Sequence, residues 1–197
     1  MIPVAHPIPK PDGFDEQCRK KGMAWLQTNP DCKRPKDFWS PFRHALADGF
    51  SNRCGYGAMW ISSGTIDHFV SIHTNKALAY DWSNYRYVEG WINSSKNRCD
   101  ETKILDPFDV ESGWFEILLP SLQLVVSNKI PVAYRQRAEN TLEWLHLRND
   151  ERIMRQRREW YGMYQKGDLS LERLRRMAPL IAAAVEKQSL SEVQSVE

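Results

Sequence analysis

The adjacent residues Asp67 and His68, with Asn93 further along the chain, carry side chains suited to metal-assisted hydrolysis. A carboxylate and an amide supply the oxygen ligands that a hard divalent ion prefers, and such an ion keeps water in its remaining positions. A neutral imidazole can take a proton from that water, because its unperturbed pKa of about 6.5 suits proton transfer near neutrality. If the fold brings these side chains together, we expect a site for one divalent ion with His68 as the base.

Each of these residues also has an ordinary structural interpretation. A histidine on an apolar strand, such as His68, is more often a hydrogen-bonded core residue than a base. Taken alone, Asn84 would be a helix cap, Asn93 a surface amide and Lys96 a solvated charge near a helix end. Their joint order and spacing, together with Asp67, favour the functional interpretation.

A predicted hairpin would position Asp67 and His68. Short runs rich in β-forming residues, at 58–61 and 65–70, lie on either side of the sequence Ser62-Ser63-Gly64. This pattern predicts two paired strands joined by a turn that contains glycine. His68 would then lie near the end of the second strand.

A predicted helix would position Asn93. From residue 84 onwards, apolar residues recur at helical spacing, and a polar residue at the start can cap the first turn. The apolar residues are Tyr85, Val88 and Ile92, and the candidate caps are Ser83 and Asn84. Asn93 falls about two and a half turns along this helix. If the helix packs across the hairpin, Asn93 comes to lie beside Asp67.

Residues 54–96 resemble the HNH endonuclease family, whose ββα-metal core has the order His, Asn, and then His or Asn. The Asp-His pair is present as Asp67-His68, the middle residue as Asn84, and the last as Asn93 with Lys96 three positions later. Over about residues 38–150 the chain also resembles a bacterial HNH subgroup found among antiphage defence genes, which includes the HNH subunit of Septu-type systems. The segments that carry this wider resemblance are 78–84, 105–110, 113–115 and 120–123.

The resemblance implies an activity and a role for each site residue. The activity is that of a divalent-metal-dependent endonuclease that hydrolyses DNA phosphodiester bonds, with antiphage defence as its setting. His68 would be the general base, while Asp67 and Asn93 would hold one Mg²⁺ (or Mn²⁺) ion that binds the scissile phosphate. Asn84 would orient the loop that carries His68.

The family also carries two Cys-x-x-Cys pairs. Here Cys54 is kept, while Gly57, Glu89 and Ile92 stand at the other three positions. A four-thiolate zinc site needs all of its sulfurs, so we expect no structural zinc. Apolar packing would hold the strands to the helix instead, through Trp60, Phe69, Tyr85, Val88, Trp91 and Ile92.

The bulk composition is that of a globular protein with one core. The chain has 197 residues, of which 42% are hydrophobic, and a net charge of only +2, so local charge must carry any argument for nucleic acid. Its four cysteines form no Cys-x-x-Cys pair, which indicates neither a disulfide scaffold nor a zinc ribbon and fits a reducing cytoplasm. The longest apolar run, 179–185, is too short to span a membrane. We therefore expect a cytoplasmic protein without a membrane partner.

We expect an α+β protein that packs as one domain, in three parts. Residues 1–36 form a proline-rich arm with a short helix over 14–27, residues 37–130 the HNH core with flanking segments, and residues 131–197 a helical tail. The core begins with an amphipathic helix over 37–50 and includes a short strand over 114–118. The tail should contain one or two helices within 134–165 and a last helix over 171–188, which Pro179 kinks or interrupts.

Basic residues are candidates for contacts with DNA. The resemblance implies that Lys96 or Arg86 meets a phosphate near the site. In the tail, arginines cluster at 152–158 and again at 173–176, and Arg155 and Arg158 are our candidate phosphate contacts. The other interpretations are a solvated helix face with pairs such as Glu151 to Arg155, or a docking surface for a partner protein.

Two other functions are compatible with the sequence. The chain can be a non-cleaving subunit that binds nucleic acid, or a nuclease subunit that is active only with a partner such as an ATPase. DNA binding that is insensitive to a chelator would indicate the first. Activity that appears only when the partner is added would indicate the second.

Overall fold

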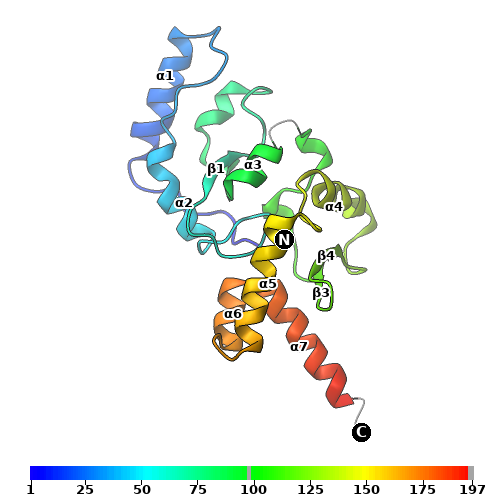
Figure 1. Ribbon diagram of the computed structural model, residues 1–197. Coiled ribbons are helices and arrows are strands. Elements are labelled where there is room, and N and C mark those ends of the chain that lie inside the picture. Colours follow the sequence, from blue (N-terminus) through cyan, green and yellow to red (C-terminus); the bar gives the residue numbers. More distant parts are fainter. Residues whose placement is uncertain (97–98, 195–197) are drawn as a thin grey trace.

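The computed structural model describes residues 1–96 and 99–194, with side chains up to residue 191. Within these residues the chain folds into two small antiparallel sheets surrounded by helices (Figure 1). The predicted α+β class is therefore confirmed. No helix in the described part of the chain is long and apolar enough to cross a membrane.

The first sheet and the helix that follows it contain the predicted site residues. β1 (Thr65–His68) pairs antiparallel with β2 (Tyr85–Val88). α3 (Gly90–Lys96) comes almost directly after β2 and packs against β1. The order strand, strand, helix is compatible with a ββα core.

The predicted pairing of β1 and the predicted start of the helix were both wrong. Residues 58–61 form no strand, and Trp60 makes only an isolated bridge with Arg53. Residues 85–88, predicted as the first turn of a helix, are instead the strand that pairs with β1. All four of these residues are buried, so the strand lacks the alternation of polar and apolar positions that marks a half-buried strand. The helix begins only at Gly90.

The N-terminal part supplies helices that pack on the first sheet and on the connection between its strands. They are a π-helical turn (Asp15–Lys20), α1 (Lys21–Thr28), a 3-10 turn (Ser40–Phe42) and α2 (Arg43–Gly49), and the connection holds 3-10 turns at Lys76–Tyr80 and Trp82–Asn84. The helix predicted over 14–27 is confirmed, and the one predicted over 37–50 is present but begins only at Ser40, with the 3-10 turn. α1 packs so closely on the connection that a Cβ at Gly22 would lie 2.4 Å from the ring of Tyr80, and α2 packs on both strands.

The C-terminal part adds the second sheet and a group of helices. Its elements are 3-10 turns at Glu101–Lys103 and Pro107–Asp109, β3 (Phe115–Leu118), β4 (Gln123–Val126), α4 (Val132–Trp144), α5 (Glu151–Gln165), α6 (Leu171–Met177) and α7 (Pro179–Gln194). The strand predicted over 114–118 and the two helices within 134–165 are confirmed, whereas β4 was not predicted. The predicted interruption of the last helix is also confirmed, because Pro179 opens α7, where its missing N–H is tolerated.

The core is continuous across the three predicted parts of the chain. Buried hydrophobic residues between Met1 and Val185 form one packed cluster. In Figure 1, α3 lies between the N-terminal helices on one side and α4 with the second sheet on the other, while α7 extends away from the body. The strand, strand, helix unit is thus supported by packing from both sides.

Candidate active site

Four of the predicted site residues share one cleft. Asp67, His68, Asn93 and Lys96 all line a cleft of about 480 Å³. The rest of its lining consists of Arg34, Trp39, Ile66, Ser71, Ile72, His73, Ser94 and Cys99. The end of β1, one face of α3, the loop after β1 and the N-terminal arm therefore meet here, and the fold brings Asp67, His68, Asn93 and Lys96 to one place.

His68 is held by a hydrogen bond to the connection between the strands. Its Nε2 lies 3.1 Å from the carbonyl oxygen of Ala79, which can only accept, so Nε2 carries the proton and Nδ1 is the free base. The rings of Trp39 and Tyr85 stand edge-on to the imidazole, with centroids at 4.7 and 5.1 Å.

Burial lowers the pKa of His68 from its ordinary value of 6.5. The Ala79 carbonyl and Asp67 oppose this shift in pKa, while the positive charges of Lys96 and Arg34 add to it. Because the net direction is downward, His68 is neutral at pH 7 and can accept a proton.

Asn84 positions the loop that follows β1. Its side chain is only 6% exposed. Its Oδ1 accepts from the Val70 backbone N–H at 2.8 Å, and its Nδ2 donates to the carbonyls of Val70 and Leu78 at 3.0 and 3.1 Å. Its own carbonyl accepts from the Phe69 N–H at 2.9 Å. Asn84 is not part of the cleft lining, so its side chain contacts the loop rather than the cleft.

Asp67 and Asn93 each keep one oxygen that accepts from no described residue. Asp67 is 3% exposed, and among the described residues its Oδ2 has no hydrogen-bond partner. The Nδ2 of Asn93 donates to Thr65 Oγ1 at 3.0 Å and to the Ile66 carbonyl at 3.5 Å, and no described residue donates to its Oδ1. No group of three His, Cys, Asp or Glu side chains converges among the described residues. A carboxylate and an amide oxygen fit a hard divalent ion that completes its shell with water.

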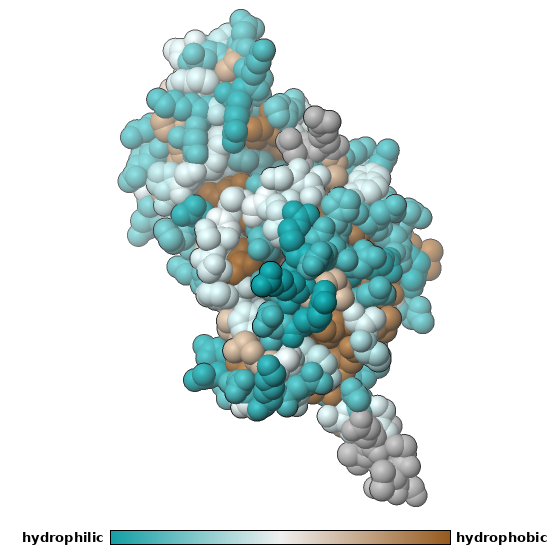
Figure 2. Space-filling view, viewed as in Figure 1, coloured by the Kyte–Doolittle hydropathy of each residue, from teal (hydrophilic) through white to brown (hydrophobic). Residues whose placement is uncertain are grey.

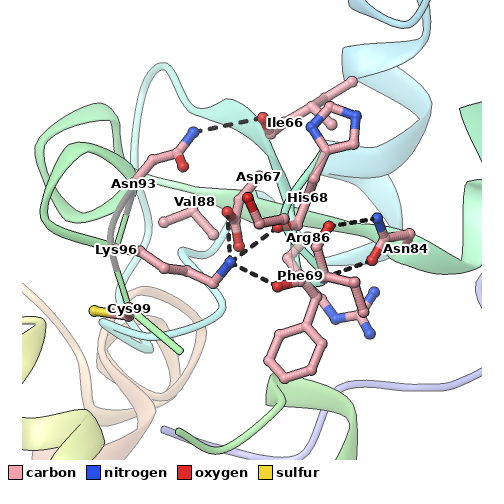
Figure 3. A network of polar contacts seen from close by, with 12 residues as sticks. Ile66, Asp67, His68, Phe69, Asn84, Arg86, Val88, Asn93, Lys96 and Cys99 are labelled. Carbon is pink, nitrogen blue, oxygen red and sulfur yellow. Dashed lines mark hydrogen bonds and ion pairs between the residues drawn. The ribbon is translucent and has the colours of Figure 1, made fainter. Parts of the chain in front are cut away.

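Lys96 connects α3 to the end of β1. Its ammonium donates to Asp67 Oδ1 at 3.1 Å and to the carbonyls of His68 and Phe69, each at 2.9 Å, and the residue is 6% exposed (Figure 3). All three N–H groups therefore have partners. The structure does not support the predicted phosphate contact of Lys96, because its charge is used inside the protein.

Arg86 is also engaged within the protein. Its Nε donates to Asp106 Oδ1 at 2.6 Å, its Nη2 to Asp106 Oδ2, and its Nη1 to the carbonyls of Ser83 and Tyr85. The guanidinium also lies 3.7 Å from the centroid of the Phe108 ring, and the residue is 4% exposed. The predicted phosphate contact of Arg86 is therefore not supported either, because this side chain fastens the segment around Asp106 to β2.

The tail arginines divide into exposed and buried ones. Arg155 and Arg158 are exposed on α5, as their predicted role requires. Arg157 is 1% exposed and donates to the carbonyls of Leu122, Leu147 and Arg148. Arg152 lies over the ring of Trp91 at 4.2 Å, which places the start of α5 beside α3. Figure 2 shows strongly hydrophilic side chains in the middle of this face, where α5 begins.

The four positions compared with the zinc-binding cysteines converge in space. Cys54 is buried, and its Sγ accepts from the N–H groups of Gly57 at 3.3 Å and Glu89 at 3.4 Å. A Cβ at Gly57 would lie 3.6 Å from this sulfur and 3.8 Å from Cδ1 of Ile92. Burial raises the pKa of the Cys54 thiol, so the sulfur is a protonated acceptor within a packed core.

Arg34 and Trp39 are among the cleft residues that sequence reasoning missed. Both come from the N-terminal part, and no spacing rule connects them with a histidine on a strand that starts at residue 65. The basic run at 33–36 was the available signal for Arg34. No known family model matches this chain, and no curated protein is detectably similar to it.

Proposed function

We propose that this chain is a divalent-metal-dependent, HNH-type endonuclease that hydrolyses DNA phosphodiester bonds. The observation that carries the proposal is His68, whose Nδ1 is a free base of lowered pKa in the same cleft as Asp67 and Asn93. The order of β1, β2 and α3 gives further support, as does the convergence of positions around Cys54.

In the proposed mechanism, His68 Nδ1 takes a proton from water as the water oxygen bonds to phosphorus and the bond from phosphorus to the leaving oxygen breaks. Asn84 keeps the loop after β1 in place, and the Ala79 carbonyl fixes the orientation of the imidazole. Asp67 Oδ2 and Asn93 Oδ1 would hold one Mg²⁺ or Mn²⁺ ion, which when bound neutralises charge on the phosphate and on the leaving oxygen.

Outside the cleft, Arg155 and Arg158 would contact phosphates along the DNA and set its position without reading bases. Their helix starts beside α3, since Arg152 packs on Trp91. A setting in antiphage defence, with a partner protein, rests on the resemblance of residues 38–150 and belongs to the same proposal.

A non-cleaving subunit that binds DNA is the second candidate. The observation that favours it is the ion pair between Lys96 and Asp67, because the ammonium neutralises the carboxylate that would hold the metal. A nuclease subunit that needs a partner would show the same lack of activity when it is alone, and activity would return once the partner is added.

The test is cleavage of supercoiled plasmid by the purified protein with Mg²⁺ or Mn²⁺, next to EDTA and His68→Ala. We expect nicked or linear DNA with metal alone, and a rate lower by about 10²-fold or more in the variant. His44→Ala is the matched control, because His44 is an exposed histidine on α2. Intact plasmid in every lane would contradict the proposal and favour a binding-only or partner-dependent subunit.

A further inference from the structure

Arg34 is a cation of the cleft lining whose charge has no partner among the described residues. It lines the cleft together with His68 and Asn93, and it is exposed. Within the described residues its guanidinium makes no hydrogen bond and no ion pair. Lys96, the other lysine or arginine among the described residues of this lining, donates all three of its hydrogens to protein oxygens. Arg34 is thus free to meet an anion that enters the cleft.

The loop that carries Arg34 is fastened at both ends. The Pro30 carbonyl accepts from Lys76 Nζ at 3.0 Å, and the Lys36 carbonyl accepts from the Tyr80 hydroxyl at 2.8 Å. Pro35, next to Arg34, is buried and has a fixed φ. The loop therefore holds Arg34 in a defined place without using its side chain.

The same anchor also fixes His68. The loop is tied to the 3-10 turn Lys76–Tyr80, and the Ala79 carbonyl in that turn accepts from His68 Nε2. The 3-10 turn Lys76–Tyr80 thus hydrogen-bonds both to the imidazole of His68 and to the loop that carries Arg34.

We propose that Arg34 binds a phosphate of the substrate strand next to the one that is cleaved. This role rests on the proposed function, and it gives the cleft a cation from the N-terminal arm that stands in for Lys96 and Arg86. A guanidinium suits the task, because its planar fork donates two parallel hydrogen bonds to phosphate oxygens. The substrate strand would then lie between the arm and α3, both of which line the cleft.

The test measures DNA binding without cleavage. Binding of a fluorescein-labelled duplex to the full chain is followed by anisotropy in EDTA, between low and moderate salt, for the wild type, Arg34→Gln and Arg34→Lys. We expect Arg34→Gln to weaken binding about tenfold and to reduce the slope of log K against log salt by about 1. Arg34→Lys should keep the slope and recover part of the affinity, because it restores the charge but not the fork.

Arg19→Gln is the matched control, since Arg19 is exposed and lies outside the cleft lining. It loses the same charge and should bind as the wild type does. Thermal melts should show unchanged stability in all three variants, because both arginines are exposed.

Binding by Arg34→Gln with wild-type affinity and slope would overturn this inference, as would a wild type that does not bind the duplex. The plasmid assay with His68→Ala judges the proposed function separately. Weakened binding by Arg34→Gln in a protein that never cleaves would support the phosphate contact and reject the nuclease. Normal cleavage by Arg34→Gln with unchanged binding would support the nuclease and reject the phosphate contact of Arg34.

Discussion

The buried ion pair between Lys96 and Asp67 makes Lys96→Met a strong test of the site's architecture. Both side chains are almost fully buried, with 6% and 4% of their surfaces exposed. In the variant, Asp67 loses its counter-ion, and the carbonyls of His68 and Phe69 lose a donor. Methionine fills similar space, so the change removes charge and hydrogen bonds more than it removes packing.

The expected loss of stability is large. Removing one partner of a buried pair leaves an uncompensated charge, which typically costs about 3–5 kcal/mol. For a chain of this size, about 1 kcal/mol shifts Tm by roughly 2–4 °C. We therefore expect Lys96→Met to lower Tm by about 6–20 °C, a large part of the total stability of an ordinary domain.

The assay is urea and thermal unfolding in EDTA, followed by tryptophan fluorescence. Lys96→Met combined with Asp67→Leu should be more stable than Lys96→Met alone, because the second change removes the unpaired charge. Lys103→Met is the matched control: its pair with Asp100 spans 3.6 Å, with 61% and 45% of the two side-chain surfaces exposed, and such a pair contributes little. A midpoint for Lys96→Met equal to that of Lys103→Met would refute the reasoning, as would strictly additive effects in the double variant.

Two further predictions concern His68 and the buried thiol. The folded-state pKa of His68 lies below its ordinary 6.5, so the unfolded chain binds the proton first, and the contribution of His68 to stability is complete above about pH 6.5 and is lost as pH falls through the folded-state pKa. His68→Gln should flatten this decline in stability, measured as urea midpoints in EDTA. Equal slopes of midpoint against pH in the wild type and the variant would contradict the prediction. Replacing Gly57, Glu89 and Ile92 together by cysteine should create a site with Cys54 that binds one zinc ion per chain, since these positions converge around the Cys54 sulfur. Metal analysis of the purified triple variant tests this, and the same variant with Cys54→Ser added is the control. A triple variant that binds no zinc would count against the comparison with HNH proteins.

The sequence predicts the fold best where local signals are strong. Pro179 marks the break between α6 and α7, and an amphipathic pattern marks α2. The sequence-based prediction fails at β2, because Tyr85 and Val88 fit a helical period as well as they fit a strand that is buried on both faces. Only pairing with β1, a tertiary contact, decides between the two.

Some residues of the candidate site could be predicted from the sequence, and others could not. Asp67, His68 and Asn93 could be found because their residue types restrict the chemistry they can do, and the fold places them in one cleft. The basic residues could not be sorted in this way, since a lysine in a sequence looks the same whether its charge faces solvent or a buried carboxylate.

The cations near the site differ in whether their charges already have partners within the protein. Lys96 lies closest to Asp67, yet its ammonium is used to hold the end of β1. Arg34 is far from the site in sequence, yet no described residue hydrogen-bonds to or pairs with its guanidinium, and its loop is tied to the turn that accepts a hydrogen bond from His68. Which cation would be available to a substrate therefore depends on the hydrogen bonds that each cation already makes within the protein. Residues 76–80 matter for this reason, because they hydrogen-bond both to His68 and to the two ends of the loop that carries Arg34.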